Sequence, residues 1–414
     1  EVFRALLKRG VSGDSQDPVA EDLVELLLTE GSNSSFASRF FPEEMTELGR
    51  SYLCLTEQDV EKVLQDPHAR SHSPIGVEPQ FGITPQAHYS FSVPASALRG
   101  PFWPLLQWHP KIGTEFIVEL MNHACSWYGE QKWPFDQLEP AWKTELDIPG
   151  EDESIIQWAN GRLYGMYRGT SVAPYALQSA LMALEKWLLE IAGREEFDHE
   201  AWLLKLLKES NNVAVTAVVA SVCIAHPEKC GRAGLALLSS RDVVQLDRSR
   251  MVSDRANPSI AKHLPSVQPQ DGIFQDERKE ADNLPHRKSD LEYLAVKLQS
   301  ESSQEEVWRV IDQHRDKLPP REEQSEKDKT WRLALHRMDA RGFEVDEEVP
   351  ASDVEEESQG EEESDDSEDA EKRYFKMALG ELEPDLEKMV EQNERDFTKQ
   401  AEDLSLVNWG RSAW

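Results

Sequence analysis

The chain has 414 residues, 45 of them lysine or arginine and 78 aspartate or glutamate, so its formal net charge at pH 7 is −33. Hydrophobic residues make up 39% and charged residues 30%, so a sizeable core can be buried over part of the chain. This acidic balance argues against a general nucleic-acid-binding protein, which gains affinity by neutralising phosphates, and against docking on an anionic membrane.

Cysteine usage and hydropathy indicate the compartment. Four cysteines imply no disulfide framework and fit a reducing environment, so we expect a cytoplasmic protein. The longest apolar stretch, residues 213–225, is too short to span a membrane. The chain opens in what reads as the middle of a helix and has no natural stop, so we expect a fragment of a longer protein.

Residues 1–93 are predicted to form an N-terminal helical segment with a proline-rich loop. Apolar residues recur at helical spacing within 18–30. Thr56 stands before acidic residues as a helix N-cap does. Residues 66–93 are rich in proline and lack periodicity, which predicts an irregular segment.

Residues 94–245 are predicted to form a helical-repeat-like core. Apolar stripes at helical spacing predict helices over 110–128 and 173–191. Residues 144–148 and 154–158 are predicted to be two short strands on either side of a Pro-Gly turn. The segment 213–225 is apolar almost all round, which predicts a helix buried on several sides.

A weak internal repeat lies within this core. Residues 108–113 and 225–231 follow the same order: the end of a predicted helix, a His-Pro pair, a glycine and the start of a new apolar helix. Proline suits the first turn of a helix because its missing N–H would have no intrahelical partner. The pattern predicts a mainly α fold of α-solenoid-like stacked hairpins, although two unrelated helix corners would give the same pattern.

The remaining residues are more polar. Residues 246–343 are predicted to be an irregular linker with further helices at 289–298, 305–311 and 331–338. The linker character rests on residues 251–290, which are polar and punctuated by four prolines.

An acidic tract precedes the C-terminal segment. Residues 344–371 contain 16 acidic residues and no basic one, so they cannot bury enough apolar surface to offset their ordering entropy. We predict a disordered acidic linker, with binding of a basic protein, phosphate mimicry and loose Ca²⁺ binding as alternatives. Residues 372–414 are predicted to be a C-terminal helical segment.

The common phosphate-binding and hydrolase motifs are missing from the sequence, so no catalytic residue is assigned and no cofactor is expected in this chain. Cys223, His226 and Cys230 supply three candidate zinc ligands, but structural zinc sites normally have four. No metal site is therefore predicted.

The candidate binding residues are an arginine, a threonine and three tryptophans. Arg168 and Thr170 come just before a strong helix, and a helix N-terminus beside an arginine can bind an anion. The alternative is that Arg168 pairs with a carboxylate such as Glu185 or Asp147 and holds the turn. The aromatic contact surface would consist of Trp103, Trp108 and Trp158, although most tryptophans are core residues.

Three stretches, residues 100–124, 167–188 and 212–238, together resemble the helical region of very large bacterial STAND (NACHT-like) ATP-binding proteins, several of which act in anti-phage defence. The tract His336-Arg337-Met338-Asp339-Ala340-Arg341 also resembles one that recurs in such proteins. The residues themselves favour structural salt bridging along a helix. The resemblance implies a P-loop module elsewhere on a parent chain and a helical array here that senses or couples. This sequence has no phosphate loop, so no catalytic residue carries over.

We therefore expect a non-catalytic interaction and regulatory region of a larger ATP-dependent switch protein. Its partner would be another protein or the rest of the parent chain. One alternative is a free-standing acidic scaffold that binds a basic protein. The other is a hydrolase or transferase with a site assembled from His109, His123, Arg168 and Glu185.

Overall fold

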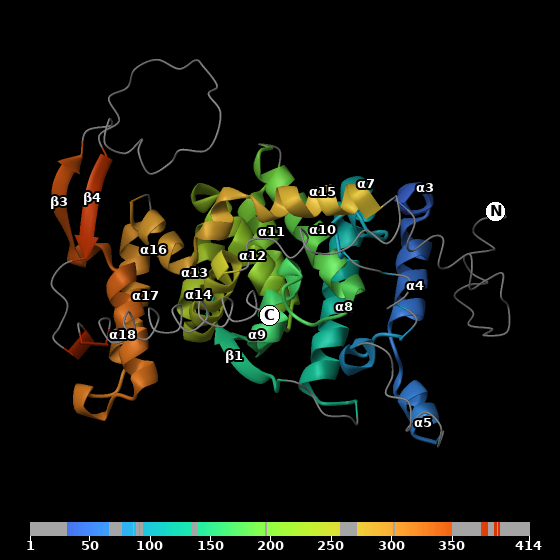
Figure 1. Cartoon of the computed structure of the whole chain (residues 1–414), viewed down its shortest axis with the longest axis horizontal. Coiled ribbons are helices and arrows are strands. Elements are labelled where there is room, and N and C mark those ends of the chain that lie inside the picture. The colour runs from blue at the N-terminus through green and yellow to red at the C-terminus, as the bar shows by residue number, and fades with distance from the viewer. Residues whose placement is uncertain are drawn as a thin grey trace, which may run out of the picture. The chain divides into compact units, whose positions relative to one another are not determined.

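The computed structural model describes residues 31–65, 77–85, 87, 91, 94–133, 139–194, 197–256, 271–300, 303–349, 374–379, 385, 386, 388 and 389. These residues are mainly helical, which confirms the predicted fold class (Figure 1). The chain divides into two compact units, Glu1–Val310 and Ile311–Trp414. The first unit thus joins segments that the sequence analysis separated. The solenoid-like stacking stays a prediction.

The N-terminal part of the first unit is helical where the sequence predicted it. Thr56 precedes its helix as expected, and its backbone N–H and hydroxyl both donate to the Asp59 carboxylate, at 2.8 and 2.6 Å. The predicted helix within 18–30 lies outside the described residues. The elements are α3 (Gly31–Phe40), α4 (Pro42–Leu53), α5 (Glu57–Gln65) and the 3₁₀ turn η1 (Glu78–Phe81).

The apolar core is built around α12 (Val213–Ala225). Every residue from Val213 to Ile224 is buried, as the all-round apolar sequence predicted. Beside it packs α10 (Tyr175–Ala192), whose Leu177, Leu181, Leu184 and Leu188 are all fully buried. The neighbouring elements are α7 (Phe102–Trp108), α8 (Pro110–Gly129), α9 (Gly161–Tyr164), η2 (Gly165–Arg168), α11 (His199–Glu209), η3 (Pro227–Lys229) and α13 (Gly231–Ser239).

The predicted hairpin is confirmed. The strands β1 (Trp142–Leu146) and β2 (Ile155–Ala159) pair antiparallel, with Trp142 opposite Ala159 and Leu146 opposite Ile155. The connection contains Gly150 at φ +85°, a left-handed conformation that glycine adopts without a steric penalty.

The two repeat corners share one backbone geometry. His109 has φ −138° and ψ 67°, and His226 has φ −133° and ψ 67°. A Cβ on Gly113 would lie 2.9 Å from the backbone nitrogen of Leu106, so this glycine does allow α7 and α8 to approach closely. The corners are therefore alike in local structure.

Residues 251–290 contain more regular structure than the predicted linker. The helix α14 (Arg241–Ala256) continues past residue 251, and α15 (Asp271–Asp282) is followed by η5 (Pro285–Lys288). The prediction was wrong here because these helices bury charged residues, so their apolar periodicity is weak. The predicted helix at 289–298 is confirmed as α16 (Leu291–Gln299).

The helix α17 (Gln304–Asp316) begins in the first unit and ends in the second. The second unit also contains η6 (Arg321–Glu323), α18 (Glu326–Met338), η7 (Ala340–Gly342), β3 (Phe343–Val349) and β4 (Tyr374–Leu379). The strands pair antiparallel with Phe343 opposite Leu379. These strands lie within residues that the sequence analysis assigned to the acidic linker and to the C-terminal helical segment. Aromatic, apolar and β-branched residues at the ends of both segments favour strand pairing over the net charge of the tract.

Candidate functional site

Eight charged side chains form a buried cluster in the first unit, and each is exposed by 7% or less. Four are arginines and four are carboxylates, so their formal charges cancel, which is the condition under which burial of charge is tolerable. We call them the buried ion cluster. Its members are Arg168 on η2, Glu185 on α10, Asp247, Arg250 and Asp254 on α14, Arg278 and Asp282 on α15, and Arg287 on η5.

Arg168 joins η2 to both α14 and α15. Its Nε donates to the two carboxylate oxygens of Asp254 at 3.2 and 3.1 Å, and its Nη2 donates to Asp282 at 3.1 Å. Arg278 in turn donates to the backbone carbonyl of Arg168 at 2.7 Å. The expected pairing of Arg168 with a carboxylate is confirmed.

The two carboxylates that the sequence analysis suggested as partners of Arg168, Glu185 and Asp147, were wrong. Asp147 accepts a hydrogen bond from Ser154 Oγ at 2.6 Å, and Glu185 binds Arg287. The true partners lie 86 and 114 residues away along the chain, on helices that the sequence did not predict.

Arg250 uses all five of its N–H groups. It donates twice to the Asp247 carboxylate, at 3.1 Å each, and once to Asp254 at 3.3 Å. The others go to the carbonyls of Arg287 and Ser289, at 3.0 and 2.7 Å. Burial raises the pKa of the Asp247 carboxyl, and the Arg250 charge opposes that rise. Arg250 therefore has no N–H left for a ligand.

Glu185 and Arg287 form a bidentate pair, with both N–O distances 2.6 Å. Burial alone would raise the pKa of Glu185, but the guanidinium charge and its hydrogen bonds lower this pKa to about 2. Burial, followed by repulsion from Arg287, lowers the pKa of His286 to about 3. The carboxylate is therefore ionised and the imidazole neutral near pH 7.

Ser221 places a hydroxyl next to this pair and next to His286, which invites comparison with a serine nucleophile. Its Oγ donates to Glu185 and lies 3.1 Å from both His286 Nε2 and Arg287 Nη1. The hydroxyl proton is thus directed at the carboxylate, and the low pKa of His286 makes it a weak base. Ser221 is also only 1% exposed, so no substrate carbonyl can reach it.

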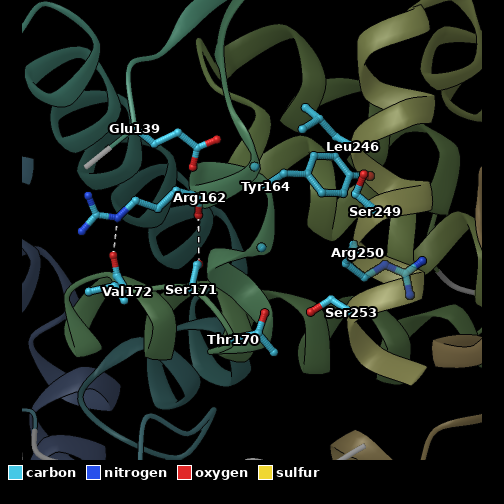
Figure 2. Close-up of a pocket in the computed structure, with 12 residues that line it drawn as sticks. Glu139, Arg162, Tyr164, Thr170, Ser171, Val172, Leu246, Ser249, Arg250 and Ser253 are labelled. Atoms are coloured by element: carbon cyan, nitrogen blue, oxygen red, sulfur yellow. Dashed lines mark hydrogen bonds between the residues drawn. The ribbon is translucent and has the colours of Figure 1, made fainter. Parts of the chain in front are cut away.

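A cleft of about 430 Å³ opens beside the cluster, between residues 161–172 and α14 (Figure 2). Thr170, one of the predicted binding residues, lines it. Leu246, Ser249 and Ser253 line it from α14. Arg250, a member of the buried ion cluster, also lines the cleft, so the cleft and the cluster adjoin at α14.

The predicted tryptophans lie apart from this site, each with a different cation above its ring. Trp108 is 47% exposed, and the Arg39 guanidinium lies 3.9 Å from its ring centroid. Lys186 lies 5.3 Å from Trp103, and Lys143 lies 3.6 Å from Trp158.

The histidines offered for a dispersed catalytic site also have separate partners. His109 Nε2 lies 2.8 Å from the carbonyl of Arg39, and His123 Nε2 lies 3.0 Å from that of Gly82. Neither is hydrogen-bonded to Arg168 or Glu185, so the predicted dispersed catalytic set gains no support from these contacts.

Among the residues that the structure describes, no group of three or more His, Cys, Asp or Glu side chains is arranged to hold a metal ion. Burial raises the pKa of the Cys223 thiol well above its usual value, and the pKa of Cys125 rises for the same reason. No helix in the described ranges is long and apolar enough to cross a membrane.

In the ion pairs at the end of α18, Arg341 binds Asp339 at 2.8 Å and Asp312 at 2.6 Å. Arg315 binds the same Asp339 at 2.7 Å. Asp339 and Arg341 of the tract 336–341 therefore form structural salt bridges, as the alternative interpretation predicted.

A scan against protein-family models matched none, and a search of curated proteins found no significant match. The resemblance to STAND-like proteins therefore stays a prediction.

Proposed function

We propose that the first unit is a non-catalytic interaction and coupling region in which α15 docks on, and is released from, the helical core. The observation that carries this proposal is the chemistry of its attachment. Among the described residues of α15, the buried side chains include those of Glu277, Arg278 and Asp282, and all three are charged. Its Ile273 is 67% exposed.

The contacts of α15 are mainly polar and include an aromatic one, in which the Arg99 guanidinium lies 4.2 Å from the Phe274 ring centroid. Glu277 accepts hydrogen bonds from Ser96 Oγ and from the backbone N–H of Ala97, the latter at 3.1 Å. Arg278 and Asp282 join the buried ion cluster through Arg168. Such groups recover their hydration on leaving, so the net free energy of docking is small although each contact is specific. Elements that move are drawn from this weakly held class.

The same contacts make α15 a sensitive coupling element. A change of a few ångströms in η2 would separate Asp282 from Arg168 Nη2 and Arg278 from the Arg168 carbonyl, so that each keeps only the other as an ion-pair partner, 3.3 Å away on the same helix. Buried charged groups that lose hydrogen-bond partners in this way cost free energy. Such a helix therefore has two favourable positions, fully docked or hydrated, and few between them. The interaction and regulatory role of this region, within a larger ATP-dependent switch protein, is proposed on that basis.

Hydrogen exchange followed by mass spectrometry on the whole chain tests the proposal. We expect residues 271–282 to exchange through an opening whose free energy lies well below that of residues 213–225. Arg278→Met should speed exchange in 271–282 by about tenfold or more while leaving 213–225 unchanged. Lys279→Met is the matched control, because Lys279 lies on the same helix and pairs with the exposed Asp276.

Two results would contradict the proposal. Exchange of α15 only through global unfolding would show that it is not an independent element. Steady ATP turnover by this chain alone would show that the region is catalytic.

A further inference from the structure

The helix α3 turns small polar side chains inward and aromatic side chains outward. Ser34 and Ser38 are fully buried, and neither hydroxyl has a hydrogen-bond partner among the residues that the structure describes. Phe36 and Phe40, one turn apart on the same helix, are 54% and 55% exposed. Both features are unfavourable for a helix that faces only water on its outer side, and exposed apolar surface of this kind marks interaction sites.

The two rings continue into a patch with α7, which packs beside α3 (Figure 1). The ring centroids of Phe36 and Phe40 are 5.0 Å apart. The Arg39 guanidinium lies 5.2 Å from the ring centroid of Phe40 and 3.9 Å from that of Trp108, which is also exposed. We call Phe36, Arg39, Phe40 and Trp108 the aromatic patch.

The aromatic patch is held in place by contacts behind it. Ala37, on the inner side of α3, is fully buried. His109 Nε2 lies 2.8 Å from the carbonyl oxygen of Arg39, which ties the end of α3 to the corner between α7 and α8. A surface whose side chains are already ordered loses less entropy when a partner binds.

The charge of the aromatic patch comes from Arg39. Its guanidinium lies over the Trp108 ring, but its N–H groups make no hydrogen bond or ion pair with any described residue. Glu43 and Glu44 lie nearby in the chain, in the first turn of α4, and neither pairs with Arg39. The exposed Lys111 adds a second cation at the corner that follows Trp108. A guanidinium can bind a carboxylate through its in-plane N–H groups while its face contacts an aromatic ring.

We propose that the aromatic patch binds an acidic peptide segment of a partner protein, one that combines large apolar side chains with a carboxylate. The apolar side chains would cover Phe36, Phe40 and Trp108, and the carboxylate would accept hydrogen bonds from Arg39. Tryptophan and arginine are enriched among the residues that contribute most to binding at protein interfaces.

The charge of the whole chain favours a peptide over an anionic membrane as the partner. A membrane would face a broad surface of a chain whose net charge is −33. A peptide meets mainly the local charge, because salt screens interactions beyond about 8 Å at physiological ionic strength. At that range the guanidinium of Arg39 is the charge that the aromatic patch presents.

This inference is independent of the proposed docking of α15, because it concerns α3 and α7. It keeps Trp108 as a contact residue, as the sequence analysis predicted, but joins it to α3 and not to Trp103 and Trp158. Those two tryptophans are half-buried, and each has a lysine over its ring.

Selection from a library of random peptides displayed on phage tests the proposal on the whole chain. Counter-selection against the double variant Phe36→Ser with Phe40→Ser removes peptides that bind elsewhere. We expect the enriched peptides to combine large apolar residues with aspartate or glutamate. Fluorescence anisotropy of synthetic copies then gives their dissociation constants for the natural chain and for each variant.

Matched variants separate the contribution of charge from that of the rings. Arg39→Glu should weaken binding of the acidic peptides by about tenfold or more, and Arg309→Glu, at an exposed arginine on α17, should leave it unchanged. Ile156→Ser is the control for the double variant, since Ile156 on β2 is as exposed as Phe36. Circular dichroism of each variant checks that the chain is folded.

The proposal is overturned if no peptide distinguishes the natural chain from the double variant. It is also overturned if the enriched peptides lack acidic residues, or if they bind Arg39→Glu as tightly as the natural chain. Two further results would replace the proposed partner with another one. Binding to vesicles of phosphatidylserine and phosphatidylcholine that the double variant loses would indicate a membrane. Self-association in sedimentation experiments that the double variant loses would indicate a second copy of this chain.

Discussion

Two buried regions of the first unit, α12 and the α14–α15 pair, are held together by opposite chemistry. Around α12 every residue from Val213 to Ile224 is buried, and almost all are apolar. Around α14 and α15 the buried groups include arginines and aspartates that pair with one another, and Arg168 on η2 bridges the two helices. Burial alone therefore does not show what stabilises a region.

The difference has an energetic consequence. Apolar packing contributes roughly in proportion to the buried area, so losing part of it has a graded cost. A balanced ion cluster contributes little net free energy, but losing one member leaves a buried charge without its partner. The α12 core should therefore tolerate small truncations, while the ion cluster should respond strongly to any single charge removal.

The largest effect is expected for Arg287→Met, which leaves the Glu185 carboxylate buried and unpaired. We predict a loss of about 3–5 kcal/mol in the free energy of unfolding, measured by urea denaturation at pH 7. Replacing both members, Glu185→Met with Arg287→Met, should recover at least half of that loss, because methionine fills a similar volume without charge.

The double variant is the test of the comparison. If it is as unstable as Arg287→Met alone, the ion pair contributes stability of its own, and the contrast with the α12 core is smaller than proposed.

The same contrast explains what the sequence could predict. The helices α8, α10 and α12 have strong apolar patterns, because their side chains bury hydrocarbon, and all three were predicted within a few residues of their bounds. The hairpin was predicted because a Pro-Gly pair separates two short apolar segments.

The charged helices were not predicted for a physical reason. A helix that buries arginine and aspartate has the composition of a solvated linker, and its partners come from distant parts of the chain. One local signal did exist: Asp247, Arg250 and Asp254 are spaced by three and four residues, which places both signs of charge on one helix face. Their burial against Arg168 could not be read from that spacing.

A smaller effect is expected from pH, through His286. Its pKa is about 3 in the folded protein and about 6.5 when unfolded, so the unfolded chain takes up the proton first as pH falls. The stability associated with the neutral imidazole is complete above pH 6.5 and is lost between pH 6.5 and 3. Between pH 7 and 5 the loss should be about 2 kcal/mol.

His286→Gln removes this titration while an amide N–H can still donate to Ser221. Urea denaturation at pH 7, 6 and 5 should show a shallower decline for the variant than for the natural chain. Lys288→Gln, which removes an exposed neighbouring charge, is the control and should decline like the natural chain. Equal slopes for all three proteins would mean that His286 is protonated in the fold.

The smallest effect is expected for Arg232→Met, an identical substitution at an exposed ion pair of the same unit. Arg232 lies 3.0 Å from Glu200, but their side chains are 51% and 37% exposed, so water screens the attraction and solvates either group alone. We predict a loss below about 1 kcal/mol in the free energy of unfolding, and a loss that vanishes in about 0.5 M NaCl. The loss for Arg287→Met should persist in the same salt, because ions do not enter the buried ion cluster. If the two substitutions cost the same amount, burial is not what separates them, and the cluster is no more than a set of ordinary surface pairs.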